Sequence, residues 1–256
     1  MSGAGEVTPP PHYSVWRRSG SSIVAWDPVA DAVRTALDDS TTLHAWAGKK
    51  PDHTVKSGRG VVYVRRLGPE LAAVRRSLRG GWMAPLLGDR YFDAAPRPFR
   101  ELAVSGEARG RGVPTPRVLA AIVHPARPGY RSEVATSWLT PGHDLSALLK
   151  PGVYDETERG AALKAVGETI VNAARAGLQH ADLNLSNIFV GPATDGGWRA
   201  LILDLDRARI QAPDTLPVEP GVDRLLRSIE KARRGGRAEW TGADAEALDA
   251  GIHHSR

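Results

Sequence analysis

Two short segments place acidic and amide side chains among strongly apolar residues. HADLNLSNIFV covers residues 180–190 and LILDLD covers residues 201–206. They contain Asp182, Asn187 and Asp204. A carboxylate can accept a proton from a hydroxyl nucleophile, and an amide oxygen beside a second carboxylate suits Mg²⁺. The two segments therefore predict a general base close to a metal site.

A β-hairpin between the two segments would bring these residues together. Residues 188–190 and 198–203 are strand-like, and the intervening GPATDGG is typical of a turn. Antiparallel pairing joins the outer ends of a hairpin, so we expect Asn187 and Asp204 to be neighbours. Asp182 lies five residues before Asn187, on a loop that leaves a helix.

The order of these residues is more informative than any one of them. A single Asp or Asn more often caps a turn than takes part in chemistry. However, the pattern H-x-D-x-x-x-x-N, followed by an apolar hairpin and another Asp, is the layout of a kinase catalytic loop and metal-binding Asp. The pattern therefore predicts a kinase-like phosphotransferase site.

A kinase also needs a basic residue on a strand, paired to a carboxylate on a helix. The lysines of the first half all precede the predicted sheet, the last being Lys56. Arg75, on a predicted strand at 71–76, takes this role instead, and Glu101 on the following helix is its expected partner. The alternative interpretation makes both residues solvated surface charges.

Two further segments are candidates for contacts with the nucleotide. Gly58 and Gly60, in SGRG, could form a shortened loop over phosphates, although such a glycine pair is more often only a turn. Backbone groups from Ser137 to Leu139 lie where two lobes would join, and we expect them to face an adenine ring.

The elements that position these residues follow from periodicity and turn signals. The first half predicts two strands, one helix and two strands after an initial short helix. The second half is mostly helical. The predicted ranges are helix 28–38, strands 60–66 and 71–76, helix 98–111, strands 117–124 and 131–139, and helices 143–150, 157–177 and 221–234.

This order of elements predicts an α+β, two-lobed, protein-kinase-like fold. We expect residues 1–20 to be a flexible tail, because they are rich in Pro, Gly and Ser. Residues 21–140 would form a β-rich N-terminal lobe with one helix carrying Glu101. Residues 141–256 would form a reduced, mostly helical lobe with the catalytic loop.

Composition narrows the class of protein. The chain has 256 residues, 41% hydrophobic and 25% charged, which is typical of a globular protein. It contains no cysteine, no apolar run long enough to span a bilayer, and no signal-peptide pattern at its start. The net charge of +5 suggests a polyanionic partner, or else it reflects an Arg-rich genome.

The region after Asp204 is short for a protein kinase. No A-P-E motif follows, and nothing there is typical of an activation loop. This favours a small-molecule or lipid kinase over a regulated protein kinase.

At roughly residues 55–240 the chain resembles the 3-deoxy-D-manno-octulosonic acid (Kdo) kinases of the lipopolysaccharide kinase group. Arg-Gly-Gly followed by Asp-Arg-Tyr, and Asp-Leu-Asn in the catalytic loop, are rather specific to that group, and Arg in place of Lys at position 75 also matches it. The segments that carry the resemblance are AVRRSLRGGWMAPLLGDRYF (73–92), RPFREL (97–102), RGVPTPRVLAA (111–121), HADLNLSNIFV, LILDLD and VDRLLRSIEK (222–231).

The resemblance implies transfer of the γ-phosphate of ATP to a hydroxyl, the 4-OH, of Kdo on a lipid A precursor. It also implies a cytoplasmic protein that is peripheral on the inner membrane of a Gram-negative bacterium. Asp182 would be the catalytic base, Asn187 and Asp204 the Mg²⁺ ligands, and Arg75 with Glu101 the phosphate-positioning pair.

The chain departs from the family pattern at a few positions, which bear on the substrate more than on the reaction. Aromatic residues of the family are replaced at Leu205, Ser77 and Leu78, and Asp223 stands where Asn is usual.

A surface for the membrane is the remaining expectation from the resemblance. Arg75, Arg76 and Arg79 stand near Trp82 and other apolar residues, which would suit a contact with an anionic membrane surface. The alternative is that Trp82 packs in the small lobe while the arginines are solvated.

Three other functions remain as alternatives. The chain could be another small kinase of this fold, acting on a different core sugar, an aminoglycoside or a protein. It could be a nucleotide-binding pseudokinase, which the intact Asp182, Asn187 and Asp204 disfavour. A nucleic-acid binder is also disfavoured, because no basic face interleaved with aromatic residues is evident.

Overall fold

The chain divides into two compact units in a computed structural model. The first unit is formed by Met1–Gly106 and Arg117–Trp138, and the second by Glu107–Pro116 and Leu139–Arg256. The structure describes residues 9–57, 60–78, 89–93 and 95–254.

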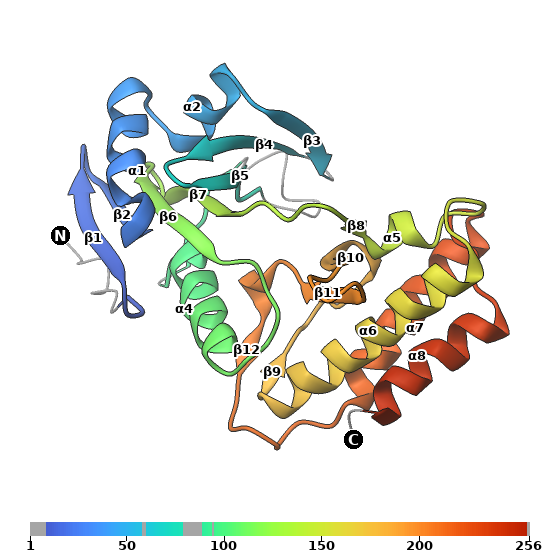
Figure 1. Cartoon of the computed structure of the whole chain (residues 1–256). Coiled ribbons are helices and arrows are strands. Elements are labelled where there is room, and N and C mark those ends of the chain that lie inside the picture. Colours follow the sequence, from blue (N-terminus) through green and yellow to red (C-terminus); the bar gives the residue numbers. More distant parts are fainter. Residues whose placement is uncertain (1–8, 58–59, 79–88, 94, 255–256) are drawn as a thin grey trace. The chain divides into compact units, whose positions relative to one another are not determined.

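The first unit is built on a seven-stranded antiparallel sheet, with the strand order β1-β2-β6-β7-β5-β4-β3 (Figure 1). The strand β5 lies inside this sheet, hydrogen-bonded to β7 on one side and β4 on the other. The strands are β1 (Tyr13–Arg18), β2 (Ser21–Trp26), β3 (His53–Ser57), β4 (Gly60–Leu67), β5 (Glu70–Arg76), β6 (Val118–Pro125) and β7 (Tyr130–Ser137).

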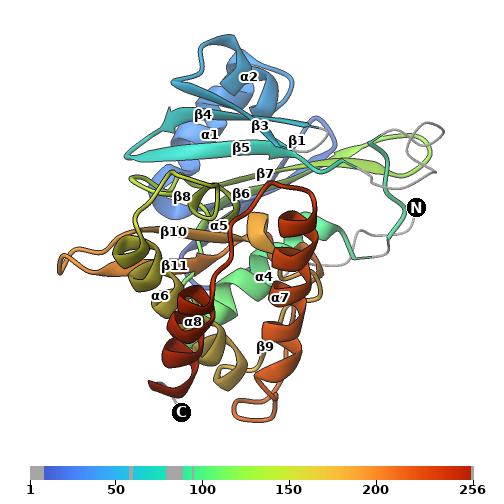
Figure 2. The same ribbon diagram turned by 90° about the vertical axis from the view of Figure 1, so that its right-hand side faces the viewer.

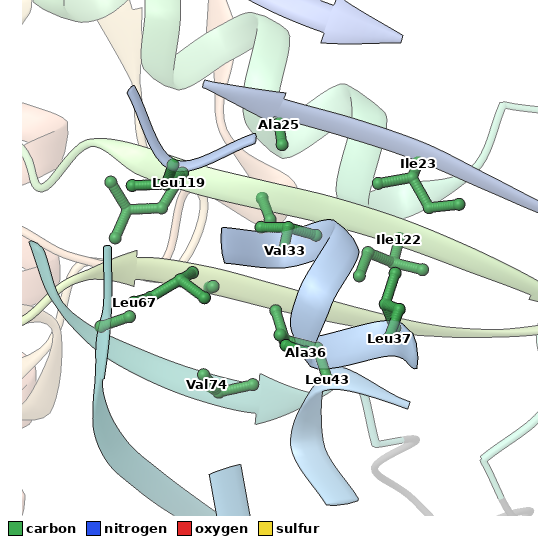
Figure 3. Close-up of a cluster of buried hydrophobic side chains, with 14 of the residues drawn as sticks. Ile23, Ala25, Val33, Ala36, Leu37, Leu43, Leu67, Val74, Leu119 and Ile122 are labelled. Carbon is green, nitrogen blue, oxygen red and sulfur yellow. The ribbon is translucent and has the colours of Figure 1, made fainter. Parts of the chain in front are cut away.

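Helices α1 (Asp27–Asp39) and α2 (Leu43–Lys49) pack against one face of this sheet. Their apolar side chains join alternate residues of the strands, such as Ala72 and Val74 of β5, in one buried core (Figure 3). Thr42 ends the loop between the two helices, and its hydroxyl accepts a hydrogen bond from the Ala45 N–H at the start of α2.

Helix α4 (Arg97–Gly110) supplies the core of the opposite sheet face. Arg75 is the cross-strand partner of Val134, so both side chains emerge on this second face. The alternation along β5 therefore places Ala72 and Val74 on one face and Arg75 on the other. The buried residues of the second core are Val24, Phe99, Leu102, Val118, Ala121 and Val134.

The N-terminal part of the sheet corrects two predictions. Residues 1–20 are not all a flexible tail, because Tyr13–Arg18 pairs residue by residue with Ser21–Trp26. The Pro- and Gly-rich flanks obscured the alternating YSVWRR. Likewise Lys56 does not precede the sheet, because it lies on the edge strand β3 and its backbone is paired with that of Val61.

The second unit is centred on the long helix α6 (Glu156–Arg175). Gly177 ends it with a φ of 78°, in the left-handed region that Gly adopts without steric cost. The C-terminal helix α8 (Gly242–His254) lies along α6 (Figures 1 and 2), and the sequence interpretation missed it. The other helices are α5 (Leu145–Leu148) and α7 (Glu219–Arg234).

A buried ion pair fixes α8 on α6. The Arg159 guanidinium donates from Nε to Asp244 Oδ1 at 2.6 Å, and both side chains are almost completely buried. Asp244 also stabilises the start of α8, because its other oxygen accepts hydrogen bonds from the N–H and hydroxyl of Thr241, the residue before the helix. Burial of this pair is compatible with stability because its charges and hydrogen bonds are satisfied together.

Short strands complete the second unit. A three-stranded sheet has the order β11-β10-β8, and a two-stranded sheet pairs β12 with β9. Among the described residues, no helix has the length and apolar composition that a membrane crossing requires. The strands are β8 (His143–Asp144), β9 (Leu178–Gln179), β10 (Ile188–Pro192), β11 (Trp198–Ile202) and β12 (Arg209–Ile210).

Candidate functional site

The predicted hairpin forms, and its open end carries two of the candidate site residues. In the β10–β11 pair Ile188 lies opposite Ile202. One further hydrogen bond, from the Leu203 N–H to the Asn187 carbonyl at 2.9 Å, extends the ladder past the last pair. Asn187 comes immediately before β10, and one residue separates Asp204 from the end of β11, so both stand at the open end of the hairpin, as the sequence predicted.

His180 anchors the loop that carries Asp182. Its Nε2 lies 3.0 Å from the Leu203 carbonyl, and its Nδ1 lies 3.1 Å from the Asp182 N–H. A carbonyl accepts and an N–H donates, so these contacts fit a neutral imidazole with the proton on Nε2. The buried ring therefore ties the backbone of the candidate base to the segment that leads into Asp204.

Two amide side chains also hold this loop. Asn187 Nδ2 donates to the Asp182 carbonyl at 2.7 Å, and Asn184 Nδ2 donates to the same oxygen at 3.2 Å. Because the amide nitrogen of Asn187 is used in this way, its amide oxygen is directed elsewhere. Asn187 thus has a structural contact through nitrogen and a candidate ligand atom in oxygen.

Burial alternates along the loop in a way that explains the composition of the two segments. Leu183, Leu185 and Leu205 are buried, whereas Asp182 and Asp204 are exposed. The apolar residues anchor the backbone in the core of the second unit, and this leaves the carboxylates at the surface. The apolar flanks thus hold the reactive groups in place without burying a charge.

Asp204 has an uncommon backbone conformation. Its φ of 56° and ψ of 69° lie in the left-handed region, and a 3₁₀ turn, Leu205–Arg207, follows it. Asp and Asn are among the few non-glycine residues that enter this region readily. Asp204, the candidate metal ligand, is thus itself the residue at which the chain turns after β11.

The donor atoms of Asn187 and Asp204 fit a hard divalent cation. An amide oxygen and a carboxylate are ligands that Mg²⁺ accepts, and in kinases the nucleotide phosphates and water supply the others. In the part of the chain that the structure describes, no cluster of three or more His, Cys, Asp and Glu residues could hold a metal alone. The site fits a metal that arrives with a nucleotide.

The predicted pair of Arg75 and Glu101 forms in the first unit. Arg75 Nη2 lies 2.6 Å from Glu101 Oε1. The Glu101 side chain is 5% exposed and that of Arg75 27% exposed, so the carboxylate is buried and the guanidinium partly open to solvent. The alternative interpretation of two solvated surface charges is therefore wrong.

The glycine pair lies at the connection between β3 and β4. Ser57 and Gly60 are opposite one another at the end of this hairpin, and Gly58 lies outside the described residues. SGRG therefore does not precede the sheet, as the sequence interpretation had it, but connects the edge strand β3 to its neighbour β4. A role over phosphates stays a prediction.

The segment from Ser137 to Leu139 is only in part suited to bind adenine through N–H groups. The Ser137 N–H donates to the Arg117 carbonyl and the Trp138 N–H to the Leu71 carbonyl, at 2.9 and 2.7 Å. Both donors are therefore occupied within the first unit. Leu139 is the first residue of the longer segment of the second unit, Leu139–Arg256, and among the described residues its N–H has no hydrogen-bond partner.

Two sets of residues stand apart from these predictions. Arg79 and Trp82, expected near a membrane, lie outside the described residues. Helix α7, in contrast, was predicted as a helix but not as part of the site. Its Ser228 hydroxyl accepts a hydrogen bond from the Leu185 N–H at 3.3 Å, which joins α7 to the catalytic loop.

Comparisons with known proteins bear on the family of the chain and on its fold. A model of the lipopolysaccharide kinase (Kdo/WaaP) family matches residues 45–251. A 3-deoxy-D-manno-octulosonic acid kinase from Xylella fastidiosa (strain M12) is 32% identical over 80% of each chain. The protein of the same name from Vibrio vulnificus (strain YJ016) is 30% identical, over 75% of this chain and 79% of the relative.

A solved structure has a similar fold. WaaP, described in complex with acyl carrier protein, matches with a TM-score of 0.52 over 83% of each chain, at 16% identity. The predicted α+β, protein-kinase-like fold is confirmed. The extent of the family match and the identity to the curated relatives confirm the predicted family as well: the chain belongs to the lipopolysaccharide kinase (Kdo/WaaP) family.

Proposed function

We propose that this protein is an ATP-dependent kinase that phosphorylates a hydroxyl group of Kdo, the 4-OH of a Kdo residue carried on a lipid A precursor. Membership in a lipopolysaccharide kinase family supports phosphotransfer to a hydroxyl. The curated relatives named for Kdo, at 30–32% identity, support the choice of acceptor sugar. The choice of acceptor rests on those relatives, whereas the roles of individual residues rest on contacts within this chain.

Asp182 is the general base of the proposed reaction. Its carboxylate accepts the proton of the attacking hydroxyl as the sugar oxygen bonds to the γ-phosphorus. The bond from that phosphorus to the bridging oxygen breaks at the same centre, and ADP leaves. His180 and Asn187 hold the Asp182 backbone through its N–H and its carbonyl, which fixes the base before substrate arrives.

Asn187 and Asp204 are the proposed ligands of Mg²⁺. When bound, the ion neutralises negative charge on the phosphate groups of ATP. The open end of the hairpin sets the spacing of these two ligands, since Asn187 immediately precedes β10 and Asp204 comes shortly after β11. The amide nitrogen of Asn187 holds the backbone of the base Asp182, and its amide oxygen is the candidate ligand of the metal. One residue therefore connects the base with the metal site.

Arg75 is the proposed contact to the nucleotide phosphates, and Glu101 is the residue that positions it. The carboxylate is buried and holds one Nη atom of the guanidinium, and a guanidinium carries five N–H donors in a fixed fork. A planar guanidinium binds phosphate through two parallel hydrogen bonds, which an ammonium does not provide. Gly58 and Gly60 would cover the phosphates, and the Leu139 N–H is the proposed donor to adenine.

The observation that carries the proposal is the catalytic loop itself. An exposed Asp182 is held from both sides of its peptide by a buried His and by the candidate metal ligand. If this loop only capped a turn, there would be no reason for the Asn187 amide both to hold Asp182 and to stand beside Asp204. We further propose that the protein works peripherally at the cytoplasmic face of the inner membrane, where a lipid A precursor would be presented.

The test is phosphate transfer measured by mass spectrometry. Purified protein with ATP, Mg²⁺ and Kdo-lipid IV_A should give a product heavier by one phosphate. Asp182→Asn keeps the shape of the side chain but removes the base, so kcat should fall by about 10²–10⁴-fold with the KM for ATP nearly unchanged. Asp195→Asn, in the exposed turn of the hairpin, is the matched control and should retain full activity.

Two results would contradict the proposal. Phosphorylation of a protein or an aminoglycoside, but not of the Kdo lipid, would show that the acceptor is wrong. Full activity of Asp182→Asn would show that the base is wrong.

A further inference from the structure

A large pocket opens beside the catalytic loop, entirely within the second unit. Its volume is about 1060 Å³, and Asp182 through Ser186 form part of its wall. Helix α7 forms another part, through Arg224, Arg227, Ser228 and Lys231. Neither candidate metal ligand, Asn187 nor Asp204, is among the residues that line it. The wall of the pocket therefore includes the candidate base but neither candidate metal ligand.

The residues of α7 that line the pocket share one face of the helix. They are spaced by three, four and seven residues from Arg224, which places them along one stripe. A neighbouring stripe of Leu225, Ile229 and Ala232 is buried and packs the helix into the unit. The hydrogen bond from the Leu185 N–H to Ser228 fixes the basic stripe beside the loop that carries the base.

The charge of this pocket is strongly one-sided. Among the side chains that line it, Asp182 is the one carboxylate, against five cations. In the part of the chain that the structure describes, none of these cations forms an ion pair with a carboxylate. Cations gathered in a concave wall concentrate their field on an anion. The five are Lys150, Arg224, Arg227, Lys231 and Arg237.

Two other arginines of α7, in contrast, are paired with a carboxylate. Glu230 pairs with Arg233 at 2.8 Å and with Arg234 at 2.7 Å. The hydrogen bonds from these two arginines lower the pKa of Glu230 to about 2. The one glutamate in the middle of α7 is thus engaged with arginines that do not line the pocket. Arg227 and Lys231 are left to face the pocket without a carboxylate.

We propose that this pocket binds the acidic sugar of the acceptor, and that Arg224, Arg227 and Lys231 determine specificity for it. The ligand class is a glycan bearing at least two anionic groups, carboxylate or phosphate, with a hydroxyl that reaches Asp182. A neutral sugar would leave the five cations without partners. The inference rests on the proposed function, because it takes Asp182 to be the base that the hydroxyl must approach.

The experiment compares two double variants of the same helix. Arg227→Ala with Lys231→Ala removes two cations that face the pocket. Arg233→Ala with Arg234→Ala removes two cations from the same helix that pair with Glu230. With Kdo-lipid IV_A and ATP, the first variant should raise the KM for the acceptor by about tenfold or more, a factor equivalent to about 1.4 kcal/mol, and leave the KM for ATP unchanged. The second variant should leave both KM values unchanged.

Equilibrium binding without nucleotide separates this inference from the proposed function. The probe is the deacylated, phosphorylated Kdo saccharide of the same lipid. Wild-type protein should bind it, and Arg227→Ala with Lys231→Ala should bind it about tenfold more weakly. Binding of this kind without any phosphate transfer would overturn the proposed function and leave the pocket assignment standing.

Other outcomes would overturn the pocket assignment. An unchanged KM for the acceptor in an active double variant would do so, and so would a raised KM for ATP, which would place nucleotide phosphates in the pocket. Vesicles of phosphatidylglycerol and phosphatidylcholine supply the last arm. If the variant loses vesicle binding but binds the deacylated saccharide as the wild type does, the cations serve a membrane surface and not the sugar.

Discussion

Replacing Asp244 by Ala should detach the C-terminal helix from the second unit. The Asp244 side chain is 1% exposed and that of Arg159 6% exposed. In the described part of the chain, the substitution leaves Arg159 paired with Glu239 alone, a half-exposed carboxylate at 3.1 Å. Removing one partner of a buried ion pair costs about 3–5 kcal/mol, and the lost contacts to Thr241 at the start of α8 fall within that range. We expect a loss of about 4 kcal/mol.

Hydrogen exchange by mass spectrometry is the assay, because it follows α8 (Gly242–His254) separately from the rest of the chain. A loss of about 4 kcal/mol in the opening free energy lowers the protection of its amides roughly a thousandfold, since each 1.4 kcal/mol is a factor of ten. Peptides from the seven-stranded sheet of the first unit should exchange as in the wild type.

Two further variants show whether the charge is the cause. Glu230→Ala breaks two ion pairs that are exposed, so it should change protection anywhere by less than about tenfold. Arg159→Met with Asp244→Leu removes both buried charges together and should recover much of the lost protection. If Asp244→Ala lowers protection of α8 no more than Glu230→Ala does, the reasoning from burial is refuted.

Two other predictions concern the first unit and the end of α6. Glu101→Gln removes the charge that holds Arg75, so kcat/KM for ATP should fall by about tenfold or more. Glu107→Gln breaks an exposed ion pair at the end of the same helix and should have little effect in the same assay. Equal losses in the two variants would contradict a positioning role for Glu101. Gly177→Ala should destabilise the protein by about 2 kcal/mol or more in urea unfolding, because a Cβ there would meet the Gln211 carbonyl at 2.4 Å in addition to a strained φ. Gly196→Ala, with a positive φ but no atom within 4 Å of a Cβ, should cost only about 1 kcal/mol, and the same cost for both would show that the contact at Gly177 is unimportant.

Much of the catalytic loop was predictable because its signals are local. The alternation of apolar and polar residues from His180 to Asn187 shows which side chains are buried, and the turn at GPATDGG defines the hairpin. The pairing of Arg75 with Glu101 followed from one strand and one helix that are close in sequence. Such features depend on neighbours along the chain, which a sequence displays directly.

The missed elements depend on contacts between distant segments. Tyr13–Arg18 becomes a strand because β2 is beside it, and its Pro- and Gly-rich surroundings gave no sign of this. Helix α8 is rich in Ala and Gly with few apolar residues, so its face toward α6 could not be recognised by periodicity. It is held on α6 by the burial of Leu248, Gly251 and Ile252 and by the ion pair of Arg159 with Asp244, two residues that are 85 positions apart.

The pocket could not be predicted from the sequence either, because it too depends on contacts between distant segments. The sequence reveals α7 as an amphipathic helix, but its basic residues look alike in a linear reading. Only the packing of Leu225 and Ile229, with the hydrogen bond of Ser228 to the catalytic loop, decides that Arg227 and Lys231 face Asp182. Arg233 and Arg234, on the same helix, pair with Glu230 and do not line the pocket.

The left-handed backbone of Asp204 has a consequence for how this position can vary. Its conformation favours Gly, Asn and Asp over every other residue type, and its proposed chemistry requires a negative charge. The two requirements are independent, yet Asp is the one residue that meets both. Random substitution at this position should therefore yield two separate classes of tolerated residue, with Gly and Asn retained in a screen for folding and Asp alone retained in a screen for growth that depends on the enzyme.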